Sequence, residues 1–357
     1  MPTTNIAKTI RPTVGFAFSG ASSRSIFYIG FLEVLSENDF PIDFIAAMSG
    51  GAIVASSYAC NTLPQLKKMA LGMDKELVFN IIERSKGRGG LYQLTKFEEF
   101  IRLYTRNQKF ENVHPRLGFV TTDVSAGEEV VLQVGDIARA VSASCTLPGI
   151  FQPFEWGNRQ LIDGGIMNIV PGNVARESNV DIVIGIDMRA TRHIFSPWQI
   201  FLKKVLNFTR QLLWPNKFDR VWQKFLNSFD YIDFFNSYPT IDDLPQKSIP
   251  PNLFSVLGKS LDLAITAQKK QRDEKFDCDL LIVPEITHLQ SWKKYLFLHF
   301  TDFSNSHTYY QAGRTTAEQH LPTLWQMLAD KEAEIAEKDR TLETMLNSKY
   351  DGSIKSQ

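Results

Sequence analysis

A serine followed by two glycines stands between an apolar run and a segment of small residues. Ser49 comes directly after the run Phe44–Met48, and Ala52–Ala59 comes after the glycines. The run has the character of a buried strand, and the small-residue segment that of a packed helix. A tight turn between strand and helix pushes a serine hydroxyl beyond the strand end, where it can act as a nucleophile. The spacing therefore predicts a nucleophile elbow at Ser49, and an ordinary strand–helix turn remains the alternative.

The residues around Ser49 are small. Ala47 and Gly51 lie two positions to either side, where a larger side chain would press the strand against the helix. With Met48 between them, the pattern is G-x-S-x-G with alanine in the first place. Gly50 supplies the backbone N–H that follows the nucleophile, and a helix N-terminus there favours a developing negative charge. These residues can therefore present a hydroxyl and help to stabilise an oxyanion.

Two more segments place polar residues and glycines at the ends of predicted strands. The first follows the apolar run Val14–Phe18. Its residues are Gly20, Ala21, Ser22, Ser23, Arg24 and Ser25. Backbone N–H groups in such a loop can bind an anion or oxyanion, and a polar helix cap explains the loop equally well. The second segment has Asp163 at a strand end before Gly164 and Gly165, a pattern that alone indicates only a turn.

The elements that would carry these segments alternate between strand and helix. Helices are expected at Ile26–Leu35, over most of 64–105 around a turn at Gly87–Gly90, at Asp136–Ser144 and at Tyr309–Met327. Further strands are expected at Arg116–Val124, Glu129–Val134, Gln160–Ile162, Asp181–Asp187 and Leu281–Pro284. This order predicts an α/β fold with a mostly parallel central sheet and helices on both faces.

Residues 194–250 interrupt that alternation. They contain two amphipathic segments with dense aromatic residues, Trp198 and Trp222 among them, and basic residues between. We interpret them as an inserted helical pair that packs on the core or makes peripheral contact with a membrane. From Leu328 onward the chain is charged and helical in character, which predicts a solvated C-terminal tail over 326–357.

The composition is that of a globular protein without a strong bias. The 357 residues are 43% hydrophobic and 22% charged, and the formal net charge is zero, so no overall field attracts nucleic acid. The three cysteines have no paired spacing, which argues against a zinc site or disulfide framework and suits a reducing compartment. The first residues lack the apolar stretch of a secretory signal, so we expect none, and no apolar run reaches membrane-spanning length. We expect a cytoplasmic protein, at most peripheral at a membrane, with no metal and no cofactor.

The order of the three polar segments resembles that of the patatin-like phospholipase family, in the bacterial branch related to neuropathy target esterase. The likeness extends to 121–129, to RAVSASCTLPGIFQP at 139–153 and to IDGGIMNIVP at 162–171. It covers about 13–190 well and 255–325 loosely. The resemblance implies an α/β-hydrolase-related three-layer sandwich: a catalytic domain at 13–325 with 194–250 inserted, after a tail at 1–12.

The same resemblance implies a serine acyl hydrolase that uses a Ser–Asp dyad and no histidine. Ser49 would be the nucleophile and Asp163 the general base, acting through an acyl-enzyme on esters of phospholipids or lysophospholipids. The amides at Gly20–Ser22 and at Gly50 would form the oxyanion hole, and Arg24 would hold that loop or meet an anionic headgroup. The six histidines lie in no triad-like pattern, although a histidine triad is not excluded by sequence.

The glycine loop departs from the family pattern G-G-G-x-R-G. Only Gly20 and Arg24 of that pattern are kept. If Ala21 or Ser22 adopts a positive φ, its Cβ costs on the order of 1–2 kcal/mol. Two alternatives therefore stay open: a weak or inactive lipid- or protein-binding module, and a hydrolase of soluble esters.

Overall fold

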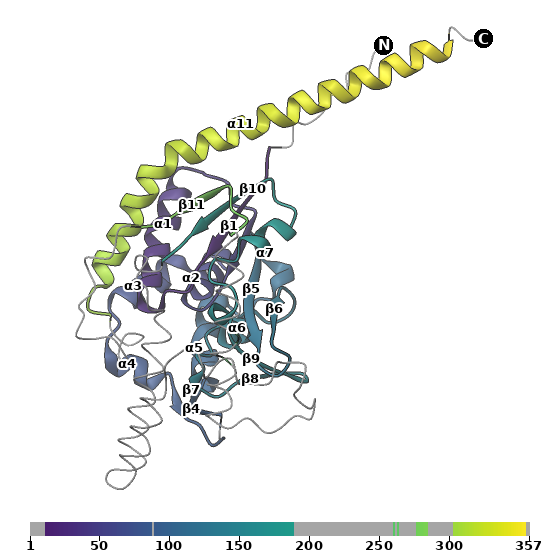
Figure 1. Cartoon of the computed structure of the whole chain (residues 1–357). Coiled ribbons are helices and arrows are strands. Elements are labelled where there is room, and N and C mark those ends of the chain that lie inside the picture. The colour runs from purple at the N-terminus through teal and green to yellow at the C-terminus, as the bar shows by residue number, and fades with distance from the viewer. Residues whose placement is uncertain are drawn as a thin grey trace, which may run out of the picture.

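The computed structural model describes residues 11–87, 89–188, 260, 263, 276–284 and 303–354 of the chain. The main sheet is built from β1 (Val14–Phe18), β2 (Phe44–Ala47), β5 (Arg116–Asp123), β6 (Glu128–Leu132), β8 (Phe154–Trp156), β9 (Arg159–Asp163), β10 (Ile182–Ile186) and β11 (Leu280–Ile282). Its order is β11-β10-β1-β2-β5-β9-β8, with β6 also paired to β5 (Figure 1). The five strands from β11 to β5 run parallel, whereas β6 and β9 run antiparallel to β5. The predicted mostly parallel sheet is confirmed.

Helices surround this sheet. The described ones are α1 (Ile26–Glu37), α2 (Gly50–Ala59), α3 (Leu63–Leu71), α4 (Lys75–Asn80), α5 (Thr95–Thr105), α6 (Ile137–Ser144), α7 (Gly172–Glu177) and α11 (Ser306–Ile354), with short 3-10 turns η1 (Ser22–Ser25), η2 (Phe110–Asn112) and η3 (Gly164–Ile166). α7 contacts β1, β2 and β10, while α1 and α2 pack with the core cluster on the opposite side of these strands.

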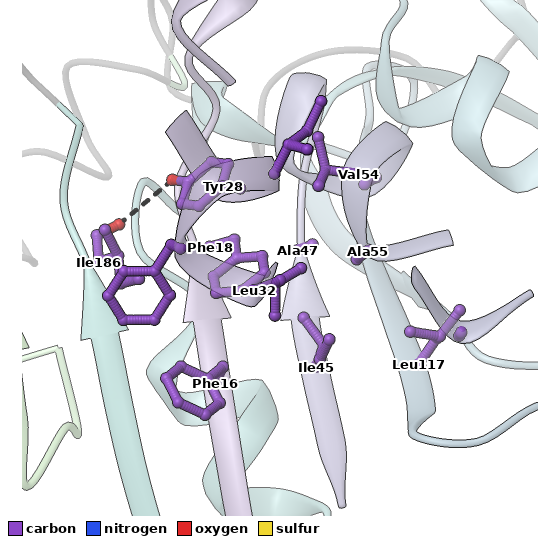
Figure 2. Close-up of a cluster of buried hydrophobic side chains, with 14 of the residues drawn as sticks. Phe16, Phe18, Tyr28, Leu32, Ile45, Ala47, Val54, Ala55, Leu117 and Ile186 are labelled. Atoms are coloured by element: carbon purple, nitrogen blue, oxygen red, sulfur yellow. Dashed lines mark hydrogen bonds between the residues drawn. The ribbon is translucent and has the colours of Figure 1, made fainter. Parts of the chain in front are cut away.

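The two faces of the sheet follow from the alternation of side chains along each strand. In β2, Ile45 and Ala47 join the large cluster under α1 and α2, whereas Phe44 and Ala46 join the smaller cluster with Val174 of α7. Figure 2 shows part of the larger cluster. There the Tyr28 hydroxyl of α1 reaches the end of β10, 3.5 Å from the Ile186 carbonyl oxygen. It also donates to the Ser19 carbonyl at 2.8 Å, at the end of β1.

The structure adds detail to two predictions of secondary structure. The region 64–105 is mainly helical, as expected, but the short strands β3 (Glu83–Arg84) and β4 (Gly90–Gln93) flank its turn, and β4 pairs with β7 (Gly149–Phe151). The helix expected at Tyr309–Met327 is also longer, since α11 is continuous over 49 residues and includes Pro322. The domain division stays a prediction, and the expected insertion at 194–250 lies outside the described residues.

The first half of α11 packs along α1, and its second half extends beyond the body of the protein (Figure 1). Its last buried side chain among those described is Leu328. None of the helices in the described parts of the chain combines the length and the apolarity that crossing a bilayer requires.

Candidate active site

Ser49 occupies the turn between β2 and α2. It is the N-cap residue of α2, with φ of 51° and ψ of −128°. A non-glycine residue in this region carries strain on the order of 1–3 kcal/mol, which the surrounding structure must support. The side chain is half-buried, so its hydroxyl lies at the boundary between core and pocket. The backbone is therefore the sharp strand-to-helix turn that the sequence predicts.

Ser144 holds this strained turn in place. Its hydroxyl donates to the Val120 carbonyl of β5 at 2.7 Å and accepts the backbone N–H of Ser49 at 2.9 Å. Ser144 is fully buried at the end of α6. The Ser49 amide is thus already engaged and is not a donor to an oxyanion. Sequence reasoning missed this role, because Ser144 is one of two serines in α6 and nothing local distinguishes it from Ser142.

The small residues around Ser49 allow strands and helices to approach closely. Ala47 is fully buried, and a Cβ at Gly51 would lie 3.1 Å from both Phe18 Cβ and the Ser19 carbonyl oxygen. The Met48 side chain is buried nearby. Its Cε would lie 3.0 Å from a Cβ added at either Gly20 or Gly165. Met48 therefore lies between the glycine loop and the aspartate segment.

Asp163 is level with Ser49 across the sheet. It ends β9 and pairs with Thr121 of β5. On the other side of β5, Phe119 pairs with Ala47 of β2. Ser49 lies two residues beyond Ala47, and Thr121 lies two residues beyond Phe119. The serine and the aspartate thus reach the same level from opposite sides of one central strand.

The Asp163 carboxyl is buried and only partly satisfied. It is 3% exposed, and its Oδ1 accepts the Gly165 N–H at 2.9 Å. Burial raises its pKa to about 6, although the Ser49 hydroxyl and the Gly165 N–H both favour the ionised form and offset part of that rise. Oδ2 has no partner at normal hydrogen-bond geometry, so Ser49 makes a close approach to the carboxyl and not a formed bond. Catalytic hydrogen bonds of this kind often tighten only with substrate present.

Gly164 and Gly165 let the chain pass close to β5 and to the elbow. A Cβ at Gly164 would overlap the Val120 carbonyl oxygen, and one at Gly165 would lie 3.1 Å from Asp163 Oδ1. The backbone is anchored on the other side, where the Asp163 N–H donates to the Thr146 carbonyl at 2.8 Å. Only glycine fits at position 164, which explains the first glycine of the motif.

The loop after β1 continues into η1. Ser22 has φ of 52°, so the positive φ considered from the sequence occurs there. Ser23 and Ser25 are buried, and the Ser25 hydroxyl donates to the Ser22 carbonyl at 2.7 Å. Arg24 donates through Nη1 to the Met188 carbonyl at 2.9 Å, beyond the end of β10. Arg24 therefore makes the first of the two contacts expected of it, holding the loop.

Several backbone N–H groups near Ser49 are free to bind an anion. Those of Gly20, Ala21, Ser22 and Gly50 donate to no partner among the described residues. Ser22, Gly50 and Ser49 all line the same pocket. Free amides beside a serine hydroxyl are the elements of an oxyanion hole.

The pocket that contains Ser49 is lined almost entirely by apolar side chains. Its hydroxyls come from Ser22, Ser25 and Ser49. The rest of the wall is supplied mainly by α1, α2, α3 and α5, with Ile53, Leu66 and Phe97 as examples. An apolar pocket with a serine hydroxyl in its wall suits a substrate with a hydrocarbon chain.

Cys145 also lines this pocket, next to Ser144 in the chain. Burial raises the pKa of its thiol well above the usual value, and the charge of Asp163 raises it further. A thiol so protected is a poor nucleophile at neutral pH. In the described residues, no group of three or more His, Cys, Asp and Glu side chains is placed to hold a metal ion.

A family model described as patatin-like phospholipase matches residues 16–176, which include both Ser49 and Asp163. Residues 16–176 form a patatin-like phospholipase domain. The resemblance that the three sequence segments indicated is therefore confirmed.

Relatives of the patatin-like domain include an uncharacterized NTE family protein of Mycobacterium tuberculosis, 27% identical over 180 residues, or 50% of each chain. Patatin-like phospholipase domain-containing protein 7 of Mus musculus is 27% identical over 182 residues, 49% of this chain and 13% of the mouse protein. The match thus spans half or less of these relatives. The crystal structure of VipD from Legionella pneumophila aligns over 92% of this chain and 81% of VipD at 13% identity, with a TM-score of 0.41.

Proposed function

We propose that this protein is a serine acyl hydrolase that cleaves carboxylic ester bonds of phospholipids or lysophospholipids. The observation that carries the proposal is the apolar pocket with Ser49 in its wall and the buried Asp163 carboxyl close to that serine. A long acyl chain can occupy such a pocket while its ester carbonyl lies at the serine. The patatin-like domain independently favours a lipid substrate.

In the proposed reaction, Ser49 Oγ attacks the ester carbonyl carbon as its proton passes to Asp163. A carboxylate is a weak base for a hydroxyl, and the raised pKa of about 6 makes Asp163 a better one while leaving it ionised at neutral pH. The carbonyl oxygen becomes an oxyanion, which the amides of Ala21, Ser22 and Gly50 stabilise. The tetrahedral intermediate collapses, the C–O bond breaks, and the leaving alcohol takes the proton from Asp163.

The second half of the reaction regenerates the enzyme. Water attacks the acyl-Ser49 carbonyl and gives a proton to Asp163, which returns it to Ser49 Oγ as the fatty acid leaves. Both halves use the same base and the same oxyanion donors. Asp163 accepts and returns one proton in each half of the reaction, so no other acid or base is needed.

Covalent labelling tests the proposal. A fluorophosphonate should modify Ser49, identified by mass spectrometry of the peptide, in the folded protein and not after heat unfolding. Ser49→Ala should abolish labelling, and Asp163→Asn should slow it by orders of magnitude because the base is lost. Ser22→Ala removes a different pocket serine and should still be labelled. A folded wild-type protein that takes no label contradicts the proposal.

One observation favours the catalytically silent alternative. Ser22 holds a strained positive φ where the family loop has glycine, which can misaim an oxyanion donor. An unlabelled protein that still binds a fatty acid would indicate a lipid-binding module. Faster hydrolysis of a short soluble ester than of micellar lysophospholipid would indicate a soluble-ester hydrolase.

A further inference from the structure

Phe303 lines the pocket but lies far outside the patatin-like match. The other lining residues fall between Ser22 and Phe151, whereas Phe303 comes shortly before α11. The family model ends at residue 176. A part of the chain beyond that model therefore contributes an aromatic wall to the pocket that contains Ser49.

The position of Phe303 is fixed by the first turn of α11. Its carbonyl accepts two hydrogen bonds from Ser306, at 3.1 Å from the backbone N–H and at 2.6 Å from the hydroxyl. Ser306 is 2% exposed, so its hydroxyl bond to Phe303 is at least partly shielded from water. The Phe303 side chain is half-buried and packs on the same apolar cluster as α1. The position of Phe303 therefore depends on where α11 packs.

α11 docks on α1 at a crossing where each helix contributes a glycine. A Cβ at Gly30 of α1 would overlap the Tyr310 carbonyl oxygen, and a Cβ at Gly313 of α11 would overlap the Phe27 carbonyl oxygen. The two backbones are therefore in direct contact. Because no larger residue fits on either side, the crossing allows α11 little freedom to shift along α1.

Polar contacts around the crossing fix its register. The Tyr310 hydroxyl donates to Glu33 of α1 at 2.7 Å and accepts from Lys67 of α3 at 2.7 Å. Arg314 forms a bidentate pair with Glu37 at 2.8 and 2.7 Å. Each partly exposed pair is weak alone, but together they tie α11 to two helices that line the pocket.

α1 connects this crossing to the active site. Ile26 and Ile29 of α1 line the pocket, while Phe27 and Gly30 meet α11. η1, which carries part of the candidate oxyanion loop, leads directly into α1 and also contacts α11. We propose that Phe303, positioned by the docking of α11 on α1, is a residue of the acyl-binding wall that determines which acyl chains the enzyme accepts. This inference rests on the proposed function.

Chain-length selectivity tests it. Phe303→Ala should lower the ratio of kcat/KM for p-nitrophenyl palmitate to kcat/KM for p-nitrophenyl butyrate by about tenfold, because only the long chain loses its apolar contact with the ring. Gly313→Leu, which displaces α11 without touching the pocket, should shift the ratio in the same direction. Trp325→Ala is the matched control, since this aromatic residue of α11 packs on Phe40, lies outside the pocket and should leave the ratio unchanged.

Binding of cis-parinaric acid, a fluorescent fatty acid, gives a second readout that needs no turnover. Phe303→Ala should weaken its affinity about tenfold, while Trp325→Ala and wild type should agree. If the wild-type protein hydrolyses no ester but the Phe303→Ala variant binds the probe more weakly than wild type does, the proposed function fails and the role of Phe303 in binding the acyl chain stands. An unchanged ratio and an unchanged affinity in a folded Phe303→Ala protein overturn the inference, as does a wild type that binds no probe.

Discussion

The glycine loop and the elbow are two turns of the same kind that are held in different ways. Each follows one of two neighbouring parallel strands, β1 and β2, and each leads into a helix. Each also contains a serine at positive φ, 52° at Ser22 and 51° at Ser49. The shared backbone strain therefore does not distinguish them. The contacts that support the strain do.

The elbow is supported from inside the protein. Its Ser49 amide is held by Ser144, a side chain with no exposed area, which is itself fixed to β5. The glycine loop is supported mainly by Arg24, whose side chain is half-buried, and by a local bond from Ser25. A hydrogen bond sealed from water is costlier to lose than one at the surface. The bond that fixes Ser144 to β5 is buried, so the turn at Ser49 has a support shielded from water, whereas the Arg24 and Ser25 bonds are only partly buried.

The largest contrast is expected between the two strained serines themselves. Ser49→Ala removes the proposed nucleophile and should lower kcat/KM for p-nitrophenyl butyrate by roughly 10⁴-fold or more. Ser22→Ala keeps the backbone amide and the strain, so its loss should stay below about tenfold. Equal losses in the two variants would mean that the turns do not have separate roles.

Asp163 lies beside the elbow, and its ionisation should separate activity from stability. Activity should rise with pH through about 6, as the carboxyl loses its proton and becomes a base. The folded pKa of about 6 is raised above the unfolded value, so Asp163 favours folding at low pH and this contribution is lost as the pH rises through 6.

Asp163→Asn should therefore stabilise the protein above pH 6, by up to about 3 kcal/mol, while abolishing activity. Below about pH 4 the wild-type carboxyl is protonated in both states, so the gain should vanish. Urea unfolding at pH 8 and pH 4 measures both values. If Asp163→Asn is less stable than wild type at pH 8, the buried Asp163 carboxylate does not destabilise the folded protein.

Removing the internal support of the elbow should have the next largest effect. Ser144→Ala leaves the Ser49 N–H and the Val120 carbonyl without this partner, and should reduce the free energy of unfolding by about 1–3 kcal/mol and also lower kcat. Ser142→Ala is the matched control: Ser142 is equally buried in α6, but its hydroxyl donates to the Ala138 carbonyl of its own helix and not to a strand. Similar effects on kcat in both variants would argue against a specific role for Ser144.

The smallest effect is expected from adding glycine to the loop. Ser22→Gly relieves the positive φ, worth about 1–2 kcal/mol, and loses about 0.5–1 kcal/mol to chain entropy, so a net gain below about 1.5 kcal/mol is expected. Ala21 has φ of −144°, and Ala21→Gly should only destabilise. Thermal unfolding of the two variants and of wild type measures these changes in stability. Stabilisation by Ala21→Gly would show that strain is not what distinguishes these positions.

The sequence was informative where the chemistry depends on local order. Ser49 and Asp163 each stand at the end of a predicted strand, and both strands occur where expected. The sequence also indicates strain near Ser22, because a loop in which alanine and serine replace glycines can place a Cβ at a positive φ. Their nearness in space followed only from family resemblance, since the antiparallel pairing of β9 with β5 has no local signal.

Features that depend on tertiary contacts could not be predicted in this way. Ser144 looks like any small helical residue until β5 and the elbow are placed beside it. Phe303 is separated from the pocket's other residues by 151 positions of chain, and nothing in its surroundings indicates a ligand. β3 and β4 are short and at most half-buried, so they lack the apolar pattern from which strands are recognised.

The protected thiol of Cys145 gives the protein a built-in reporter. Alkylating reagents attack thiolates, and the raised pKa keeps this half-buried thiol mostly protonated at neutral pH. Iodoacetamide should therefore modify Cys145 slowly when no ligand is bound, and faster as the pH rises. A bound fatty acid that covers the pocket wall at Cys145 would slow the alkylation further, so occupancy could be followed on the unaltered chain by mass spectrometry.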